Sequence, residues 1–102
     1  MSGFLTDGRA DRGEKISVFV KFLDEKEFRD YSIFNFVDRD GCNVSTYGAV
    51  KASPIELKDV EVGDCVLVEG RVAKYGSFGG TEVTRLSHLK IMRNMGKPEE
   101  KT

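Results

Sequence analysis

The segment GDCVLVEGRV, residues 63–72, carries the clearest pattern in the sequence. Valines recur along it with a period of two, while the other set, Cys65, Leu67, Glu69 and Arg71, is mixed, which indicates a β-strand with one buried face. Val66, Val68 and Val72 share that face, and Gly70 is in phase with them. A glycine in phase with core residues lets a strand bend sharply, as a small barrel requires. The segment therefore predicts a curved strand that fills the interior of an all-β domain with valines.

Other segments have the alternation or the β-branched and aromatic composition of strands. Strands are expected at residues 15–23, 31–37, 42–50, 65–75 and 81–92. In the first strand the alternating set Ile16, Val18, Val20 and Phe22 is the more apolar and should face the core. Phe19 and Lys21, in the other set, should then face outward. Residues 24–30 are expected to form a charged turn, and Gly41 suits a tight turn over residues 38–41.

A different signal begins at Ser53. Serine followed by proline is a common helix start, and Glu56 stands three residues after Ser53 as in a capping box. The pattern predicts a short helix of one or two turns between the third and fourth strands. Its apolar residues, Ile55 with Leu57 or Val60, should close one end of the barrel.

The 102 residues suffice for one domain, expected at residues 15–92. Residues 1–14 have no period and are expected to be a flexible arm, and residues 93–102 a frayed tail. No apolar run is long enough to span a membrane, and the first residues lack the apolar stretch of a signal peptide. We expect a cytoplasmic protein, or a nuclear one in a eukaryote, without a membrane partner.

The sequence contains no recognisable catalytic or metal-binding motif. Cys42 and Cys65 are the only cysteines and His88 the only histidine, so no zinc-binding pattern is present. A disulfide between the two cysteines is formally open, but reduced thiols fit an intracellular chain better. The sequence has no phosphate-binding loop and no nucleophile elbow. We expect no enzyme activity, no cofactor and no small-molecule substrate.

The order of three strands, a short helix and two strands resembles the oligonucleotide/oligosaccharide-binding (OB) fold, a five-stranded Greek-key barrel. The resemblance covers residues 15–92. IFNFVDRDG (33–41) and GDCVLVEGRV (63–72) are similar to motifs of the OB domains of replication protein A and of anticodon-binding domains. Matching the phase of those families places Phe34 and Phe36 in the core, and Tyr31, Ile33 and Asn35 outside.

The resemblance also implies a binding site, because OB domains hold single strands on the face of strands two and three and between two loops. Bases stack on aromatic rings there, and cations follow the phosphates. Carried over residue by residue, the candidate nucleic-acid-binding residues are Phe19, Lys21, Phe28, Asn35, Asn43, Ser45, Tyr47, Arg71, Lys74, Tyr75, Phe78 and Arg85. Tyr75 and Phe78 stand in a glycine-rich stretch expected to be a loop that closes over the strand.

These observations favour a single-stranded DNA-binding protein of low sequence specificity, acting in replication, recombination or repair, whether cellular or encoded by a phage or plasmid. The formal net charge is −1, but Lys and Arg outnumber Asp and Glu by two over residues 64–93. RNA binding shares the same fold and stays open. A protein-docking OB subunit, or a homo-oligomer, is the alternative that the outward apolar residues Phe19, Ile33 and Leu67 favour.

Overall fold

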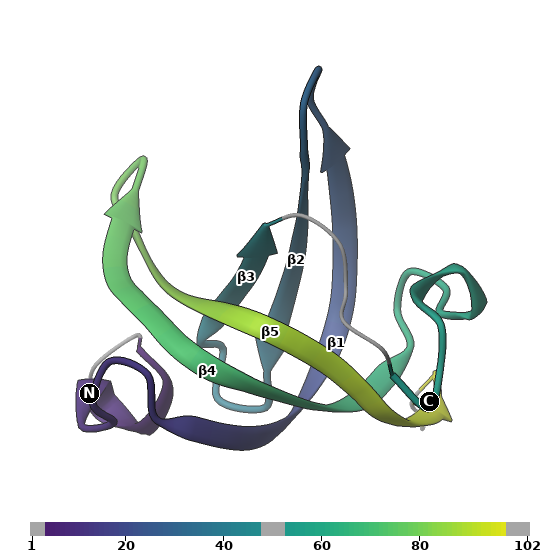
Figure 1. Ribbon diagram of the computed structural model, residues 1–102, viewed down its shortest axis with the longest axis horizontal. Coiled ribbons are helices and arrows are strands. Elements are labelled where there is room, and N and C mark those ends of the chain that lie inside the picture. The colour runs from purple at the N-terminus through teal and green to yellow at the C-terminus, as the bar shows by residue number, and fades with distance from the viewer. Residues whose placement is uncertain (1–3, 48–52, 98–102) are drawn as a thin grey trace, which may run out of the picture.

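Five strands form one closed sheet in the computed structural model, which describes residues 4–47 and 53–97 (Figure 1). The strands are β1 (Lys15–Glu27), β2 (Ser32–Asp38), β3 (Asn43–Tyr47), β4 (Cys65–Phe78) and β5 (Thr81–Gly96). Around the ring they follow the order β1-β2-β3-β5-β4, and β4 pairs with β1. All pairs are antiparallel except β3 with β5. The all-β prediction is confirmed.

The core lies inside the ring, where the alternation placed it. Val66, Val68 and Val72 are at most 1% exposed, and Phe36 is fully buried. A Cβ atom on Gly70 would lie 3.3 Å from both Leu86 Cβ and the Ser87 carbonyl oxygen, so β4 and β5 approach closely at this glycine. Phe34 is also buried, and the phase predicted for the second strand is therefore confirmed.

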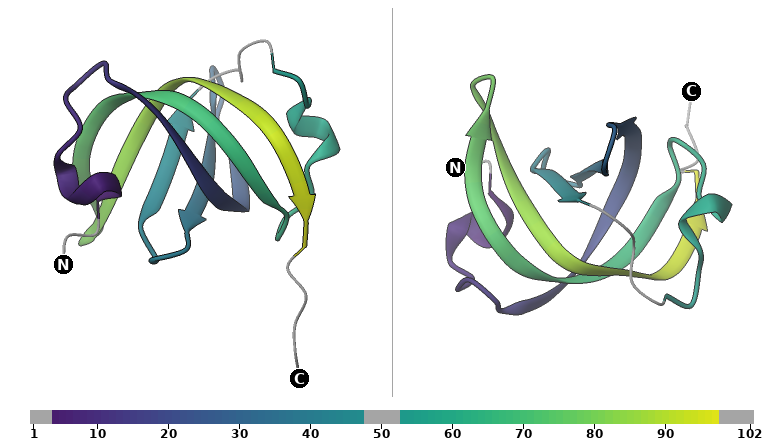
Figure 2. Two further views of the ribbon diagram at one scale, coloured as in Figure 1. Left: turned by 90° about the horizontal axis from the view of Figure 1, so that it is seen from below. Right: turned by 45° about the horizontal axis from the view of Figure 1, so that its top comes forward.

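Two long hairpins rise on either side of the shorter β3 (Figures 1 and 2). Residues 24–27, expected in a turn, continue β1 and pair with residues 32–35 of β2. Residues 76–78, expected in a loop, continue β4, and the hairpin turns at Gly79 and Gly80, both with positive φ. The charges and glycines suggested loops, but cross-strand pairing holds both segments as strands, and residues 24–27 are exposed on both faces.

The ends of the chain take more part in the fold than their composition suggested. Leu5 and Ala10, in the segment expected to be a flexible arm, are buried in the core. A 3-10 turn spans Leu5–Gly8, and the Gly13 N–H donates to the carbonyl oxygen of Val72. Residues 93–96, expected in the tail, extend β5. Periodicity missed the first segment because its buried residues are irregularly spaced.

The link between β3 and β4 contains a three-residue 3-10 turn, Leu57–Asp59, in place of the expected helix. The predicted capping box is wrong, because the Ser53 hydroxyl accepts a hydrogen bond from the Ile91 N–H at 3.0 Å. Glu56 stands at the N-cap without a side-chain hydrogen bond. Val60 is buried, and Ile55 and Leu57 pack against the core as the closing residues. No helix among the described residues is long and apolar enough to cross a membrane.

Candidate functional site

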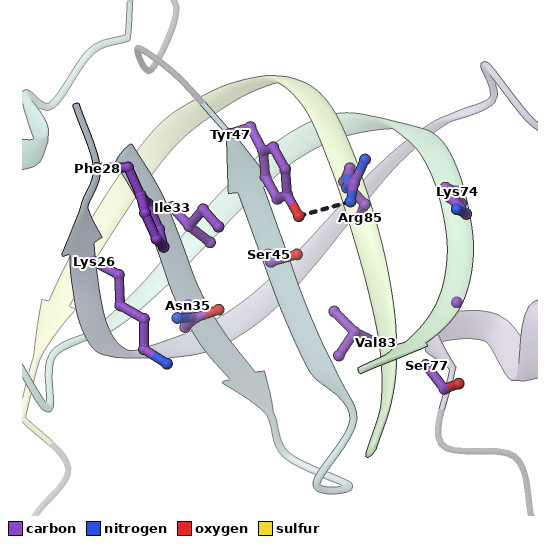
Figure 3. A pocket seen from close by; sticks show the side chains of 11 residues that line it. Lys26, Phe28, Ile33, Asn35, Ser45, Tyr47, Lys74, Ser77, Val83 and Arg85 are labelled. Atoms are coloured by element: carbon purple, nitrogen blue, oxygen red, sulfur yellow. Dashed lines mark hydrogen bonds between the residues drawn. The ribbon is translucent and has the colours of Figure 1, made fainter. Parts of the chain in front are cut away.

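A groove runs over β3 between the two hairpins, and every strand contributes to its lining (Figure 3). Its walls and floor are formed by Lys26, Phe28, Ile33, Asn35, Ser45, Tyr47, Lys74, Gly76, Ser77, Val83 and Arg85. Ser45, only 6% exposed, belongs to the floor. The groove therefore depends on the closed sheet and on the length of both hairpins, which bring residues from distant parts of the chain together.

The pairing of the strands explains which side chains meet in the groove. One row across the sheet pairs Asp24 with Asn35, Asn35 with Ser45, and Ser45 with Arg85. The next row pairs Lys26 with Ile33 and Ile33 with Tyr47. Directly paired residues share a face of the sheet. A polar row thus runs beside a row that is mostly apolar and aromatic.

A β-bulge in β1 turns its last residues towards this face. The register shifts between Phe22, which pairs with Phe36, and Asp24, which pairs with Asn35. One extra residue reverses the facing of the strand beyond it. Asp24 then accepts a hydrogen bond from the Asn35 side-chain amide at 2.8 Å. Because a carboxylate of this kind only accepts, the amide nitrogen of Asn35 is turned to Asp24, and its carbonyl oxygen remains available.

Three aromatic rings on this face form a continuous stack. The Phe28 and Tyr31 ring centroids are 5.0 Å apart with an angle of 19° between the planes, and those of Tyr31 and Tyr47 are 5.9 Å apart at 13°. All three rings are 43–48% exposed. Large exposed aromatics gathered on one face of a small protein are typical of a binding surface.

Arg85 completes the stack at the far side of Tyr47. Its guanidinium carbon lies 3.9 Å from the Tyr47 ring centroid, and Nη2 donates to the Tyr47 hydroxyl at 2.7 Å (Figure 3). Because β3 lies between β2 and β5, Tyr31 and Arg85 reach Tyr47 from opposite sides of its strand. The guanidinium occupies a place where a flat ligand group would stack equally well.

The charge of the groove differs from that of the chain. Its lining contains three cations, Lys26, Lys74 and Arg85, and no carboxylate. Within the described residues, none of the three belongs to an ion pair. The whole chain has a formal net charge of −1. The excess of positive charge in the lining is therefore local, although Asp24 at the end of the polar row offsets part of it, and it favours an anionic ligand.

The structure brings six of the predicted site residues together in the groove: Phe28, Asn35, Ser45, Tyr47, Lys74 and Arg85. Asn43 stands at the start of β3 and does not line it. Phe19, Lys21 and Arg71 lie outside the groove, on the outer side of β1 and β4. Single-strand periodicity predicted their outward facing but could not show which part of a closed sheet they would occupy.

Tyr75 has an intramolecular role that the sequence analysis did not anticipate. Its hydroxyl donates to the Ala10 carbonyl oxygen at 2.8 Å, and its ring meets Phe4 edge-on with centroids 5.2 Å apart. Tyr75 thus anchors the segment before β1 and does not line the groove. Phe78 ends β4, and its side chain is outside the described part of the structure.

Six groove or stack residues are absent from the predicted set: Lys26, Tyr31, Ile33, Gly76, Ser77 and Val83. The phase of β2 already placed Tyr31 and Ile33 outside, so the strand pattern contained a signal for them. Lys26 had none, because its facing depends on the bulge. Val83 could not be predicted either, because its place in the groove depends on the pairing of β5 with β3.

The chain matches no protein-family model, and no curated protein is significantly similar to it. Function must therefore be argued from the groove itself.

Proposed function

We propose that this chain has the OB fold and binds single-stranded DNA in the groove, with low sequence specificity. Five strands in the order β1-β2-β3-β5-β4, with the single parallel pair β3–β5, support the fold assignment. A groove over β2 and β3, between the β1–β2 and β4–β5 hairpins, agrees with the usual ligand face of that fold. Replication, recombination or repair are the processes in which such a protein would act.

The observation that carries the proposal is the ring stack beside three cations that make no ion pair within the described residues. Rings offer flat apolar surfaces to bases, and stacking contributes about 1–3 kcal/mol per base without regard to sequence. Lys26, Lys74 and Arg85 supply the charges that a phosphate backbone attracts. A protein ligand would instead favour a continuous apolar surface, and the polar row through Asn35 and Ser45 interrupts this one.

The number of cations limits the electrostatic part of binding. Each phosphate contact on a single strand contributes a slope of about −0.7 to the dependence of log K on log salt concentration. Three groove cations therefore give an expected slope of about −2. Binding should be weakened by salt but not abolished, because stacking is less sensitive to ionic strength.

The test is a titration of fluorescently labelled oligo(dT) of about eight nucleotides, a length within the range for one OB domain. Tyr47→Leu and Tyr31→Leu should each weaken binding by about 1–3 kcal/mol. Tyr47→Phe is the matched control: it keeps the ring, loses the Arg85 hydrogen bond and should bind nearly as the wild type does. Circular dichroism checks that each variant is folded.

The same titration with oligo(U) compares RNA with DNA. Equal or tighter binding to RNA would replace DNA as the proposed ligand. No binding of either polymer by the wild type at low salt would overturn the function, and normal binding by both leucine variants would overturn the site.

A further inference from the structure

A second surface with the chemistry of a nucleic-acid contact lies outside the groove, on the outer face of β1, β4 and β5. Pairing across these strands places Phe19 opposite Leu67 and Leu67 opposite Arg93. Beside this row, Ser17, Glu69 and Lys90 form another. The intervening β4 residues are buried, so both rows face away from the core. Because β4 and β1 close the ring opposite β3, this surface and the groove occupy different sides of the molecule.

Cations dominate this surface, which we call the outer basic face. Its charged residues are Lys15, Lys21, Arg71, Lys90 and Arg93, with Glu69 as the single carboxylate. Glu69 is already paired with Lys15, whose Nζ lies 2.9 Å from Oε1. The hydrogen bond from Lys15, helped by the charges of Lys15, Lys90 and Arg71, lowers the pKa of Glu69. Four positive charges remain in excess on a chain whose total is −1.

Three of these cations are not held in an ion pair by any described residue, although Lys90 lies across from Glu69. Lys21, Lys90 and Arg93 are exposed and make no ion pair within residues 4–47 and 53–97. Phe19, 57% exposed, begins the row that ends at Arg93, and Lys21 follows two residues later on the same face of its strand. An exposed ring on a face that carries several cations suits a base flanked by phosphates better than it suits an apolar protein surface.

We propose that a single strand too long for the groove continues onto the outer basic face, where Phe19 stacks on a base and Lys21, Lys90 and Arg93 contact phosphates. This inference rests on the proposed function of the groove. Strand β1 connects the two sites, because Lys26 lines the groove and Lys21 and Phe19 follow on the same strand. The eight residues from Phe19 to Lys26 span roughly 23 Å of extended chain. Only an oligonucleotide longer than the groove can reach both.

The test compares oligo(dT) of about eight and about twenty-five nucleotides, each titrated over a range of salt concentrations. The triple variant K21Q/K90Q/R93Q should bind the short oligonucleotide as the wild type does. For the long one, its salt slope should be shallower by about 2, since three phosphate contacts are lost at about 0.7 each. Phe19→Ser should weaken binding of the long oligonucleotide by about tenfold and leave the short one unchanged.

The matched control is R9Q/R12Q/K58Q, which removes the same charge from exposed positions outside the outer basic face. Its salt slope for the long oligonucleotide should be closer to that of the wild type. Equal effects of the two triple variants would show a non-specific charge effect and overturn the proposal. A wild type that binds the short oligonucleotide but gains nothing from the longer one would also overturn it. Failure to bind the short oligonucleotide at all would instead refute the groove.

Light scattering gives a further decisive result. If Phe19→Ser dissociates an oligomer and leaves long-strand binding unchanged, the face is a protein contact and the proposal is wrong. If the wild type is a monomer whose binding of the long oligonucleotide falls in this variant, the proposal is supported.

Discussion

Arg85 illustrates how one side chain can serve both the free and the bound state of a site. In the free protein its guanidinium stacks on Tyr47 and donates to the same residue's hydroxyl. In the proposed complex, a base that stacked on that side of Tyr47 would take its place, and the released guanidinium would be free to contact a phosphate. A planar cation suits both arrangements.

This exchange makes a prediction about salt dependence. Arg85→Ala should make the slope of log K against log salt shallower by about 0.7, because one phosphate contact is lost. Arg85→Lys should keep the slope, since it retains the charge while losing the planar group. The measurement is an oligo(dT) titration at several salt concentrations. An unchanged slope in Arg85→Ala would show that Arg85 remains on Tyr47 in the complex.

His88 is the one non-glycine residue with positive φ among those described, at 54°. It lies where the β4–β5 pairing shifts, between the pairs Arg71–Ser87 and Glu69–Lys90. The left-handed region costs most residues about 1–2 kcal/mol and costs glycine almost nothing. Glycine loses more chain entropy on folding, which cancels part of that gain. His88→Gly should therefore raise the free energy of unfolding in urea by about 0.5–1 kcal/mol, and His88→Val should lower it. A decrease in His88→Gly would mean that the imidazole makes a contact that outweighs the strain.

At the scale of elements, Asp64 fixes the turn that leads into β4. Its carboxylate accepts from the Glu61 N–H at 2.9 Å and from the Asn94 side chain at 3.2 Å, and it lies 3.5 Å from the Lys97 ammonium. The backbone hydrogen bond from Glu61, followed by Asn94 and the charge of Lys97, lowers the pKa of Asp64 against the opposing effect of burial. The side chain thus ties the start of β4 to the end of β5.

A lowered pKa in the folded state sets the sign of a pH effect. Stability from this carboxylate is present above the pKa it has in the unfolded chain, about 3.9, and is lost as the pH falls through that value towards the folded pKa. Asp64→Asn should be less stable at pH 7, by about 1–3 kcal/mol. Its free energy of unfolding should fall less than that of the wild type between pH 5 and pH 3. Parallel pH profiles for the two proteins would contradict this assignment.

The strands also show how much of the fold could be predicted from the sequence. The alternation in residues 15–23 and 65–72 predicted β1 and β4, and their buried faces, because half-buried strands have a period of two. It could not predict that both strands continue into hairpins exposed on both faces, where no period remains. The alternation also fails to predict side-chain facing beyond a β-bulge. Asp24 and Tyr75 each follow a register shift that changes the facing of the strand. The resemblance to OB domains supplied the six groove residues, whereas Lys26 could not be predicted because its facing depends on the bulge in β1.

At the scale of the whole molecule, the segment before β1 is part of the core. Leu5 is 3% exposed and its N–H donates to the Thr84 hydroxyl at 3.0 Å. Leu5→Ala should lower the free energy of unfolding by about 2–4 kcal/mol, as truncation of a buried leucine does. Leu23→Ala, at a site 37% exposed, is the matched control and should cost much less. Chemical denaturation measures both, and equal losses would show that Leu5 is not held in the core.

The strand pairs that close the ring differ in the length of their hydrogen-bonded ladders. The described residues of β3 and β5 form three pairs, from Asn43–Val83 to Ser45–Arg85, whereas β1 and β4 form seven. Amide protons along β3 and the facing part of β5 should therefore exchange with deuterium sooner than those between β1 and β4, because the shorter ladder opens at lower free energy. The hydrogen bond from Arg85 on β5 to Tyr47 on β3 connects the two strands through their side chains. A strand laid in the groove would cross the pairing of β3 with β5, and protection from exchange there would report occupancy without any label on the nucleic acid.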